Sequence, residues 1–446
     1  MALAAWLAFE HWRGDMLDIS VAARADLSDR DENPSMCMDA RRSPSPLRIC
    51  FITETLHAGV GRHIVDAASE LACRGHKIHL IYSPSRFEPR FLAHLTGLAN
   101  IHCEPVPMPR NIGFADIAAF AAIKGYVRKN GPFDIVHGHS SNGGGYARLL
   151  RFSGTHKILY SPHAFVTLSP VPGREKRLAF RAIEWLLARL TDCIICTSRG
   201  ELEHALDLQI HRKRLALIAN GGSPAAAPSR EATRAKLGIA PDQIVVGFAG
   251  RMEDQKAPQH LIASVLPLLQ AVPRLTLLMI GEGPKRALLE AQLERAGLAQ
   301  RAIWPGAVNA TSYMPAMDLF VLPSVYEGFA YVLIEALYAG LPIVATPVGG
   351  SQESVISGVN GFVVPQGARA EMADAIRTLA TDDELRRWMG EASRARAEYF
   401  SVPRMVDSIE GSYFRLLARR ERAGSAPLRG FRTGTQAGSV GESAQP

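Results

Sequence analysis

The chain has 446 residues, more than one hydrophobic core usually holds, so we expect two domains of roughly 200 residues each. Hydrophobic residues make up 47% of the chain and charged residues 21%, which excludes disorder over most of its length. The net charge of +7 is unevenly placed, because residues 47–222 carry 22 Lys and Arg against 13 Asp and Glu. A basic first half predicts an anionic partner: a phosphorylated substrate, an acidic lipid surface or nucleic acid.

Residues 1–46 have no sustained periodicity, and we expect either a disordered leader or a gene start placed too early. Three methionines, Met16, Met36 and Met38, precede the first convincing strand and are compatible with the second reading. Residues 1–9 are apolar but lack the basic start of a signal peptide. The sequence therefore favours a cytoplasmic protein.

The cysteines and apolar runs agree with that location. Six scattered cysteines are typical of free thiols in a reducing compartment. Cys193 and Cys196 have C-x-x-C spacing, but in the strand expected over residues 191–198 they would point to opposite faces, so we interpret them as core residues. Long apolar stretches such as 261–280 are interrupted by proline, glutamine and arginine, and no transmembrane helix is expected.

Short β-branched runs alternate with helical patterns along the chain, which is typical of parallel βαβ units. The first series of expected strands is 48–53, 77–83, 134–140, 157–162, 192–197 and 215–220. The second series begins at residue 243 and continues at 275–281, 302–305, 318–323, 342–346 and 361–364. Each series predicts one doubly wound sheet.

These patterns divide the chain into two Rossmann-like domains, the first over 47–222 and the second over 223–402. Asn220-Gly221-Gly222 predicts a flexible hinge between them. A helix at about 403–420 is expected to cross back over the first domain, and residues 424–446 are Gly/Ser/Ala-rich and predict a disordered tail. Two such α/β domains would face each other across a cleft, with ligands bound at their strand C-termini.

The strongest motif follows the strand over 318–323, where Glu327-Gly328-Phe329-Ala330 leads into an apolar helix that contains Glu335. A carboxylate in an apolar helix is costly to bury, so Glu335 must face a cleft or bind hydroxyls or cations. Backbone N–H groups near Phe329 are expected to be free to meet a phosphate. Helix capping by the two glutamates and a glycosidase acid–base pair remain alternatives.

A second motif, Gly250-Arg251-Met252-Glu253-Asp254-Gln255-Lys256, follows the strand that begins at residue 243. Arg251 and Lys256 offer a guanidinium fork and a point charge to a diphosphate, and Gly250 permits a tight exit from the strand. The alternative is a surface salt-bridge cluster with Glu253 and Asp254. The position at a strand C-terminus favours a functional site.

A third motif, His57-Ala58-Gly59-Val60-Gly61-Arg62-His63, lies between the first strand and the first helix. Glycine there lets the backbone approach a phosphate, although the G-x-G-x-x-G fingerprint fails at Ile64. Strand-end histidines form a fourth group, His137, His139 and His163. We interpret His163 as a ligand of a substrate hydroxyl and favour packing for the other two over metal binding, because no carboxylate or cysteine accompanies them.

These motifs, in this order, resemble those of the family 4 glycosyltransferases over about residues 48–420. The most specific match is the glutamate pair with seven residues between, and Gly281-Glu282-Gly283-Pro284, Ser161-Pro162-His163 and 341–346 support it. The resemblance implies a GT-B fold, retention of anomeric configuration, and neither metal nor cofactor. It also implies an acceptor-binding first domain over 47–222 and a nucleoside diphosphate sugar donor bound mainly by the second domain, over 223–402.

The resemblance also implies a role for individual residues. Glu335 matches the glutamate that binds the donor ribose, and Glu327 the one near the transferred sugar's hydroxyls. Arg251 and Lys256 match the diphosphate clamp, and His163 the histidine near the reacting face of the sugar. The remaining donor-binding positions are Gly59, Gly250, Gly328, Phe329 and Ala330; two usual glycines are replaced, by Ala58 and Ala330.

The acceptor is expected at the basic first domain, and a lipid-diphosphate-linked oligosaccharide in exopolysaccharide or lipopolysaccharide assembly would match its charge. The expected helix 174–190 sets Arg174, Lys176, Arg177 and Arg181 beside apolar residues that include Phe180 and Leu187, and predicts either peripheral docking on the inner membrane face or an ordinary solvated helix. Alternatives to a UDP-sugar or GDP-sugar hexosyltransferase are an epimerase, a glycogen-type synthase or a noncatalytic nucleotide-sugar-binding subunit. No motif supports nucleic-acid binding.

Overall fold

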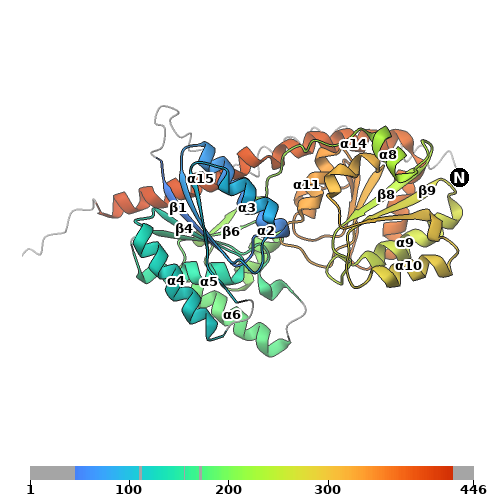
Figure 1. Ribbon diagram of the computed structural model, residues 1–446. Coiled ribbons are helices and arrows are strands. Elements are labelled where there is room, and N and C mark those ends of the chain that lie inside the picture. The colour runs from blue at the N-terminus through green and yellow to red at the C-terminus, as the bar shows by residue number, and fades with distance from the viewer. Residues whose placement is uncertain (1–45, 110–112, 155, 170–172, 425–446) are drawn as a thin grey trace, which may run out of the picture. The chain divides into compact units, whose positions relative to one another are not determined.

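The computed structural model describes residues 46–109, 113–154, 156–169 and 173–424 (Figure 1). The tail expected over 424–446 and the leader expected over 1–46 lie outside these ranges, apart from residues 424 and 46. The described residues form two parallel sheets, as the α/β class predicts. Among the described helices, none combines the length and apolarity that a membrane span requires.

The first sheet has seven strands in the order β3-β2-β1-β4-β5-β6-β7. Its strands are β1 (Arg48–Thr53), β2 (Lys77–Tyr82), β3 (Ile101–Pro105), β4 (Ile135–His139), β5 (Lys157–Ser161), β6 (Cys193–Cys196) and β7 (Leu215–Leu217). Its helices are α2 (Ala58–Cys73), α3 (Pro89–Thr96), α4 (Ala115–Asn130), α5 (Ser141–Leu149), α6 (Arg174–Ala188) and α7 (Arg199–Asp207).

Side chains of β1 alternate between two cores, one on each face of this sheet. Ile49 and Phe51 pack in a cluster with α2 and α3, whereas Cys50 and Ile52 pack in a second cluster with α4 and α5. Because both faces are covered, β1 reads as a continuous apolar run, which is why its sequence predicts a central strand. Its C-terminal end delivers the chain to the loop before α2.

The second sheet has six strands in the order β10-β9-β8-β11-β12-β13. Its strands are β8 (Ile244–Ala249), β9 (Leu275–Ile280), β10 (Ala302–Gly306), β11 (Leu319–Leu322), β12 (Ile343–Ala345) and β13 (Gly361–Val363). Its helices are α8 (Arg230–Leu237), α9 (Pro258–Ala271), α10 (Arg286–Arg295), α11 (Tyr331–Tyr338), α12 (Ser351–Ser354), α13 (Arg369–Thr381) and α14 (Asp383–Ala397).

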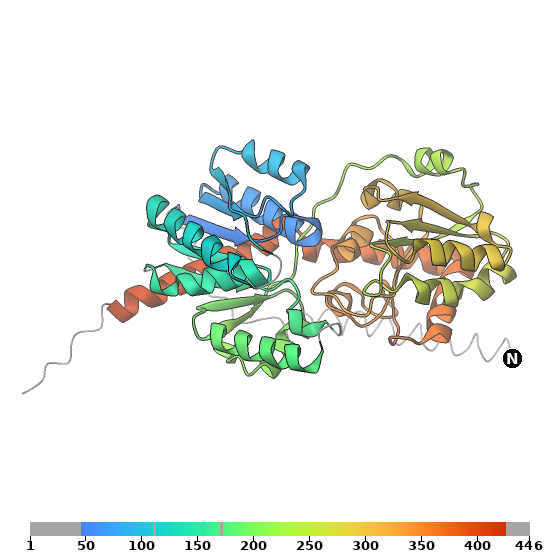
Figure 2. The ribbon, with the colours of Figure 1, turned by 60° about the horizontal axis from the view of Figure 1, so that its bottom comes forward.

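The last helix, α15 (Val402–Gly424), packs on the first sheet although it follows the second in the chain (Figures 1 and 2). Ile409 and Tyr413 are buried in the same cluster as Ile49 of β1. Arg74, at the end of α2, forms ion pairs with Asp407 and Glu410 of this helix. The core of the first sheet is therefore completed by the C-terminal part of the chain.

The Gly221-Gly222 segment, where the sequence predicts a hinge, makes close backbone contacts. Gly222 pairs with Ser401, so the two chain segments between the sheets run side by side there. A Cβ atom on Gly221 would lie 2.7 Å from the carbonyl oxygen of Ser401. These glycines allow a close approach of the two backbone segments, and the hinge stays a prediction.

Candidate functional site

The loop between β11 and α11 holds Glu327 in a partly enclosed position. Its Oε1 lies 2.7 Å from Nζ of Lys256 and accepts a hydrogen bond of 2.8 Å from the hydroxyl of Ser324. The Glu327 side chain is 9% exposed and that of Lys256 17%, so this ion pair is largely withdrawn from water. The sequence places these two residues in separate motifs, and the fold brings their charged groups into contact.

Arg251 does not join this pair. Its guanidinium is 68% exposed and forms an ion pair of 2.7 Å with Glu253, while Asp254 pairs with Lys285. The predicted clamp of Arg251 with Lys256 is therefore not assembled here, and Arg251 instead makes the surface contact that was its alternative. Because exposed ion pairs contribute only about 0–1 kcal/mol, an incoming diphosphate could recruit the guanidinium at little cost.

Gly250 and Gly281 lie where the loop after β8 meets the loop after β9. A Cβ on Gly281 would fall 2.0 Å from the carbonyl oxygen of Gly250, and one on Gly283 would fall 2.6 Å from that of Met252. The Lys256 side chain runs past Gly250, with its Cδ 3.3 Å from a Cβ built there. Small residues are thus required for the close contact that sets the course of Lys256.

Gly328 brings the Glu327 loop against the loop after β5. A Cβ on Gly328 would lie 2.7 Å from the backbone nitrogen of Ala164 and 2.8 Å from the carbonyl carbon of His163. His163 and Ala164 have φ angles of 55° and 96°, which are uncommon for residues with a side chain. The backbone N–H of Ala164 donates to the buried carboxyl of Glu201, and this bond helps to hold the turn.

Glu335 lies on α11, partly buried, with cationic side chains as neighbours. Burial raises the pKa of its carboxyl, and the positive charges of Arg62 and Lys256 oppose that rise. The positive charges of Arg62 and Lys256 are consistent with the expectation that Glu335 faces cations. Arg62 belongs to the first domain's α2, and sequence reasoning gave it no role.

Gly59, at the start of α2, lies next to α11. A Cβ there would meet only the ring of Tyr331, at 3.4 Å. The preceding Ala58, which replaces a usual glycine, has a φ of 50°, and its backbone N–H donates to Glu88. The alanine therefore adopts the left-handed conformation that glycine would favour, with its amide already engaged.

Phe329 and Ala330 are more enclosed than the sequence predicts. Both are buried, and the ring of Phe329 packs against Phe400. The backbone N–H of Ala330 donates to the carbonyl of Gly349 at 3.4 Å, so this amide is not available to a phosphate as expected. Gly349 in turn approaches the backbone of Gly328, which makes these residues the frame of the loop.

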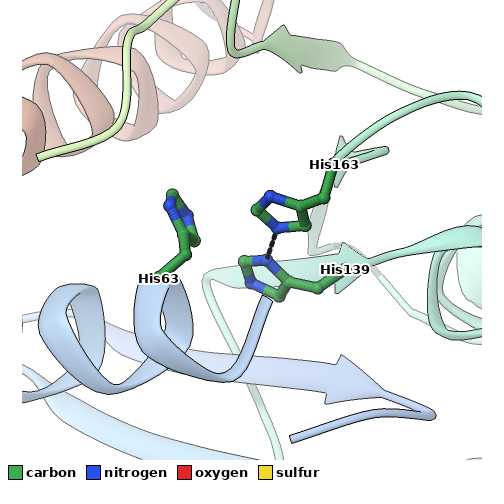
Figure 3. Close-up of side chains that lie close together, drawn as sticks. All are labelled: His63, His139 and His163. Carbon is green, nitrogen blue, oxygen red and sulfur yellow. Dashed lines mark hydrogen bonds between the residues drawn. The ribbon is translucent and has the colours of Figure 1, made fainter. Parts of the chain in front are cut away.

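Histidines from three elements gather beside this loop (Figure 3). His139 Nδ1 lies 3.1 Å from His163 Nε2, and the ring of His63, from α2, is 4.5 Å from that of His163. His137 stacks on His139 and has both ring nitrogens engaged by Tyr413 and Ser161, the packed role favoured for it. The participation of His63 was missed, although a histidine on the buried stripe of an amphipathic helix is a usable signal.

Two family models match the chain. One, described as Glycosyl transferases group 1, matches residues 229–396, and the other, described as Glycosyltransferase Family 4, matches residues 57–224. The chain belongs to the group 1/family 4 glycosyltransferases. One model covers the second sheet of this glycosyltransferase and the other covers the first sheet except β1, and together they contain all four predicted motifs.

Relatives and solved structures agree with this membership. The glycosyltransferase is 26% identical over 402 residues to D-inositol 3-phosphate glycosyltransferase of Corynebacterium urealyticum, covering 82% of this chain and 95% of the relative. Anabaena HepE in complex with UDP and glucose superposes with a TM-score of 0.70 at 22% identity, covering 82% of this chain and 99% of HepE. The lipopolysaccharide outer core galactosyltransferase WaaB superposes at 0.64 with 18% identity, covering 83% and 99%. The fold is accordingly GT-B.

Proposed function

We propose that this glycosyltransferase moves a hexosyl unit, with retention of anomeric configuration, from a UDP-sugar or GDP-sugar to an anionic or lipid-linked acceptor. The carrying observation is the enclosed Lys256–Glu327 pair beside the His163 loop. It sets a cation for a diphosphate next to a carboxylate for sugar hydroxyls. HepE, a structure of the same fold, was solved with UDP and glucose, which supports this class of donor.

Lys256 and Arg251 would stabilise the charge that develops on the departing diphosphate. A phosphate oxygen of that leaving group would then accept the proton of the attacking acceptor hydroxyl, as the sugar–phosphate bond breaks on the same face. Glu327 would hold the sugar and Glu335 the ribose. Because the cations act on charge that grows during the reaction, removing either should slow turnover more than it weakens binding.

A thermal-shift screen of nucleoside diphosphates and their sugars tests the donor, because a ligand that binds the folded chain raises its melting temperature. Selective stabilisation by UDP or GDP would name the base. Transfer is then measured by mass spectrometry, and the anomeric configuration of the product by NMR. Absence of a shift with every nucleotide would overturn the proposed donor site.

The same assays separate the alternatives. An epimerised sugar formed without acceptor identifies an epimerase, and growth of a glucan chain identifies a glycogen-type synthase. If Glu327→Ala binds nucleotide but leaves the pathway product in cells unchanged, a noncatalytic subunit is the better description.

The acceptor side carries exposed apolar and basic groups on α6. Leu178, Trp185 and Leu186 are 66%, 44% and 58% exposed, and Arg174 and Lys176 are also exposed. Phe180 and Leu187, predicted to share this surface, are half-buried instead. Exposed apolar residues with flanking cations are suited to an anionic membrane surface. We include peripheral membrane docking through α6 in the proposed function.

Further exposed apolar residues lie on other elements of the first domain. Phe114 and Ile117 near the start of α4 are 92% and 69% exposed, and Phe152 after α5 is 79% exposed. An anionic acceptor is also consistent with the Corynebacterium relative, whose name gives it a phosphorylated acceptor. The WaaB neighbour's name includes lipopolysaccharide, which makes a glycolipid the first acceptor to test.

Sedimentation with vesicles tests the docking. The chain should pellet with phosphatidylglycerol-containing vesicles and be released by salt, because screened charges attract the surface less. Replacing Leu178 and Trp185 by serine should weaken pelleting, whereas the same change at exposed Leu288 on α10 is the matched control. Equal pelleting of both variants would contradict docking through α6.

A further inference from the structure

His63, His139 and His163 come from a helix, a strand end and a loop, and their ring nitrogens converge (Figure 3). One nitrogen of each ring lies within 4.8 Å of one nitrogen of the other two. Elements of the first sheet fix all three backbone positions, since α2, β4 and the loop after β5 adjoin neighbouring strands. The cluster is therefore built into the fold of the first domain.

In two of these rings, one nitrogen has no hydrogen-bond partner within the described residues. These nitrogens, His63 Nε2 and His139 Nε2, are both buried. Burial away from water disfavours the charged form of an imidazole. A neutral imidazole has a lone pair, which is the form that binds metal ions.

Residues around the cluster orient its rings as the surroundings of metal sites do. His63 Nδ1 lies 3.0 Å from the side-chain oxygen of Asn220, so Nδ1 carries the proton and Nε2 the lone pair. The ring of His139 stacks on His137 at 4.2 Å, and His137 is itself held by Tyr413. The ligand atoms are thus supported by a polar contact and by packing.

The spacing suits a small tetrahedral ion. Two nitrogens about 2.0–2.1 Å from zinc lie roughly 3.3 Å apart in a tetrahedron, and His139 Nδ1 and His163 Nε2 are already 3.1 Å apart. The ion would replace the hydrogen bond between His139 Nδ1 and His163 Nε2, with the shared proton moving to another ring nitrogen, whereas His63 Nε2 has no hydrogen bond to lose. Three imidazoles without a carboxylate favour zinc, cobalt, nickel or copper over magnesium or calcium.

We propose that His63, His139 and His163 bind a divalent transition-metal ion of the zinc class, and that this ion inhibits the enzyme by occupying His163. Binding does not depend on the proposed transfer reaction. The inhibition rests on the role proposed for His163 next to the transferred sugar. The ion is a reversible inhibitor here, and turnover does not require it.

Cobalt(II) is the probe, because its visible absorption reports a tetrahedral nitrogen site. The full chain, without a histidine tag and with exposed Cys73 replaced by serine, is titrated with Co²⁺ in the absence of nucleotide. One equivalent should bind, and one equivalent of Zn²⁺ should bleach the band. His63→Gln should weaken Co²⁺ affinity by roughly tenfold to a hundredfold or more, and Asn220→Ala by about tenfold.

His57→Gln is the matched control, because His57 is an exposed histidine just before α2 and outside the cluster. Melting curves without metal establish that each variant is folded. Stoichiometric binding that survives in folded His63→Gln and His139→Gln, or absent binding in the parent chain, overturns the site. If Co²⁺ binds as expected but transfer is unaffected, the metal site stands and the inhibition, with the role given to His163, is wrong.

Discussion

The Glu327 carboxylate and the diphosphate of the donor compete for the ammonium group of Lys256. The carboxylate lies 2.7 Å from the lysine ammonium and neutralises it, so we expect a bound diphosphate to replace that contact. We predict that Glu327→Gln lowers kcat by about two orders of magnitude or more, as loss of an interaction made with the reacting sugar does, while UDP affinity is kept or rises. Calorimetric UDP titration and initial rates measure the two effects. Parallel loss of both would show that Glu327 mainly positions Lys256.

Glu335 is expected to behave in the opposite way, and its stability effect depends on pH. Its folded pKa is raised above 4.5 by burial, so the folded state holds the proton at pH values where the unfolded chain has lost it. Its stabilising contribution is present below pH 4.5 and is lost as pH rises through the folded pKa. Glu335→Gln should therefore raise the melting temperature at neutral pH, while it weakens UDP binding more than turnover.

The melting-temperature gain of Glu335→Gln should narrow as the pH falls toward 4.5. Glu398→Gln, a change at a surface glutamate on the segment after α14, is the control and should show no such pH-dependent gain. If Glu335→Gln were less stable than the parent at neutral pH, attraction to Arg62 and Lys256 would outweigh the burial cost. The Glu335 carboxylate would then stabilise the folded state at neutral pH rather than destabilise it.

Two glycines in the first turn of α2, Gly59 and Gly61, are expected to serve donor binding and close packing respectively. A pair of alanine variants can separate these roles. Gly59→Ala meets only the Tyr331 ring at 3.4 Å, so the fold should be kept while the added methyl group hinders a phosphate and weakens UDP binding roughly tenfold, or 1.4 kcal/mol. Gly61→Ala would place Cβ 2.7 Å from the backbone of Leu56 and 2.8 Å from Phe91, which should cost about 1–3 kcal/mol of stability.

Melting curves and UDP titrations of both variants test this division. A stable Gly61→Ala chain, or a Gly59→Ala chain that binds UDP normally, would contradict it. The second result would also remove Gly59 from the donor site. Since the two positions are two residues apart in one helix, general effects of alanine on helix stability are closely matched between them.

Most strands could be predicted, because buried parallel strands are continuous apolar runs bounded by turn residues. The strand missed was β3, an edge strand of sequence Ile-His-Cys-Glu-Pro with no fully buried residue. An edge strand has one neighbour and needs few apolar side chains, so its sequence resembles a loop. Helix α15 begins at Val402 and includes the expected 403–420 segment.

The sequence singles out Glu327 and Glu335 because a carboxylate beside an apolar helix signals its own chemistry, and their roles in donor binding stay predictions. Contacts between motifs were not predictable, because the Lys256–Glu327 pair and the approach of Gly328 to His163 depend on how distant loops meet. Arg251 shows a different limit, since the sequence offered both a diphosphate clamp and a salt bridge with Glu253, and only the fold shows the exposed pairing with Glu253. His63 joined the histidine cluster only once the buried face of α2 was known.

Helix α15 follows the second sheet in the chain but packs in the core of the first sheet. Ile409 of α15 and Ile376 of α13 are both buried, at 1% and 0% exposure, but in the cores of the first and second sheet. Truncating either to alanine should cost about 2–5 kcal/mol. We predict that Ile409→Ala speeds hydrogen exchange in β1 and β4, whereas Ile376→Ala speeds it in β8 and β9.

UDP should sharpen this contrast between the two cores. If the nucleotide binds mainly through residues of the second sheet, saturation at a hundred times Kd adds about 2.7 kcal/mol to that part of the molecule. UDP should then restore slow exchange in β8 of Ile376→Ala and leave β1 of Ile409→Ala fast. Equal acceleration of both sheets by either variant would mean that α15 and the Gly222–Ser401 pairing couple them into one cooperative unit. In that case nucleotide binding would protect the first sheet as well, and the acceptor side would be ordered by the donor.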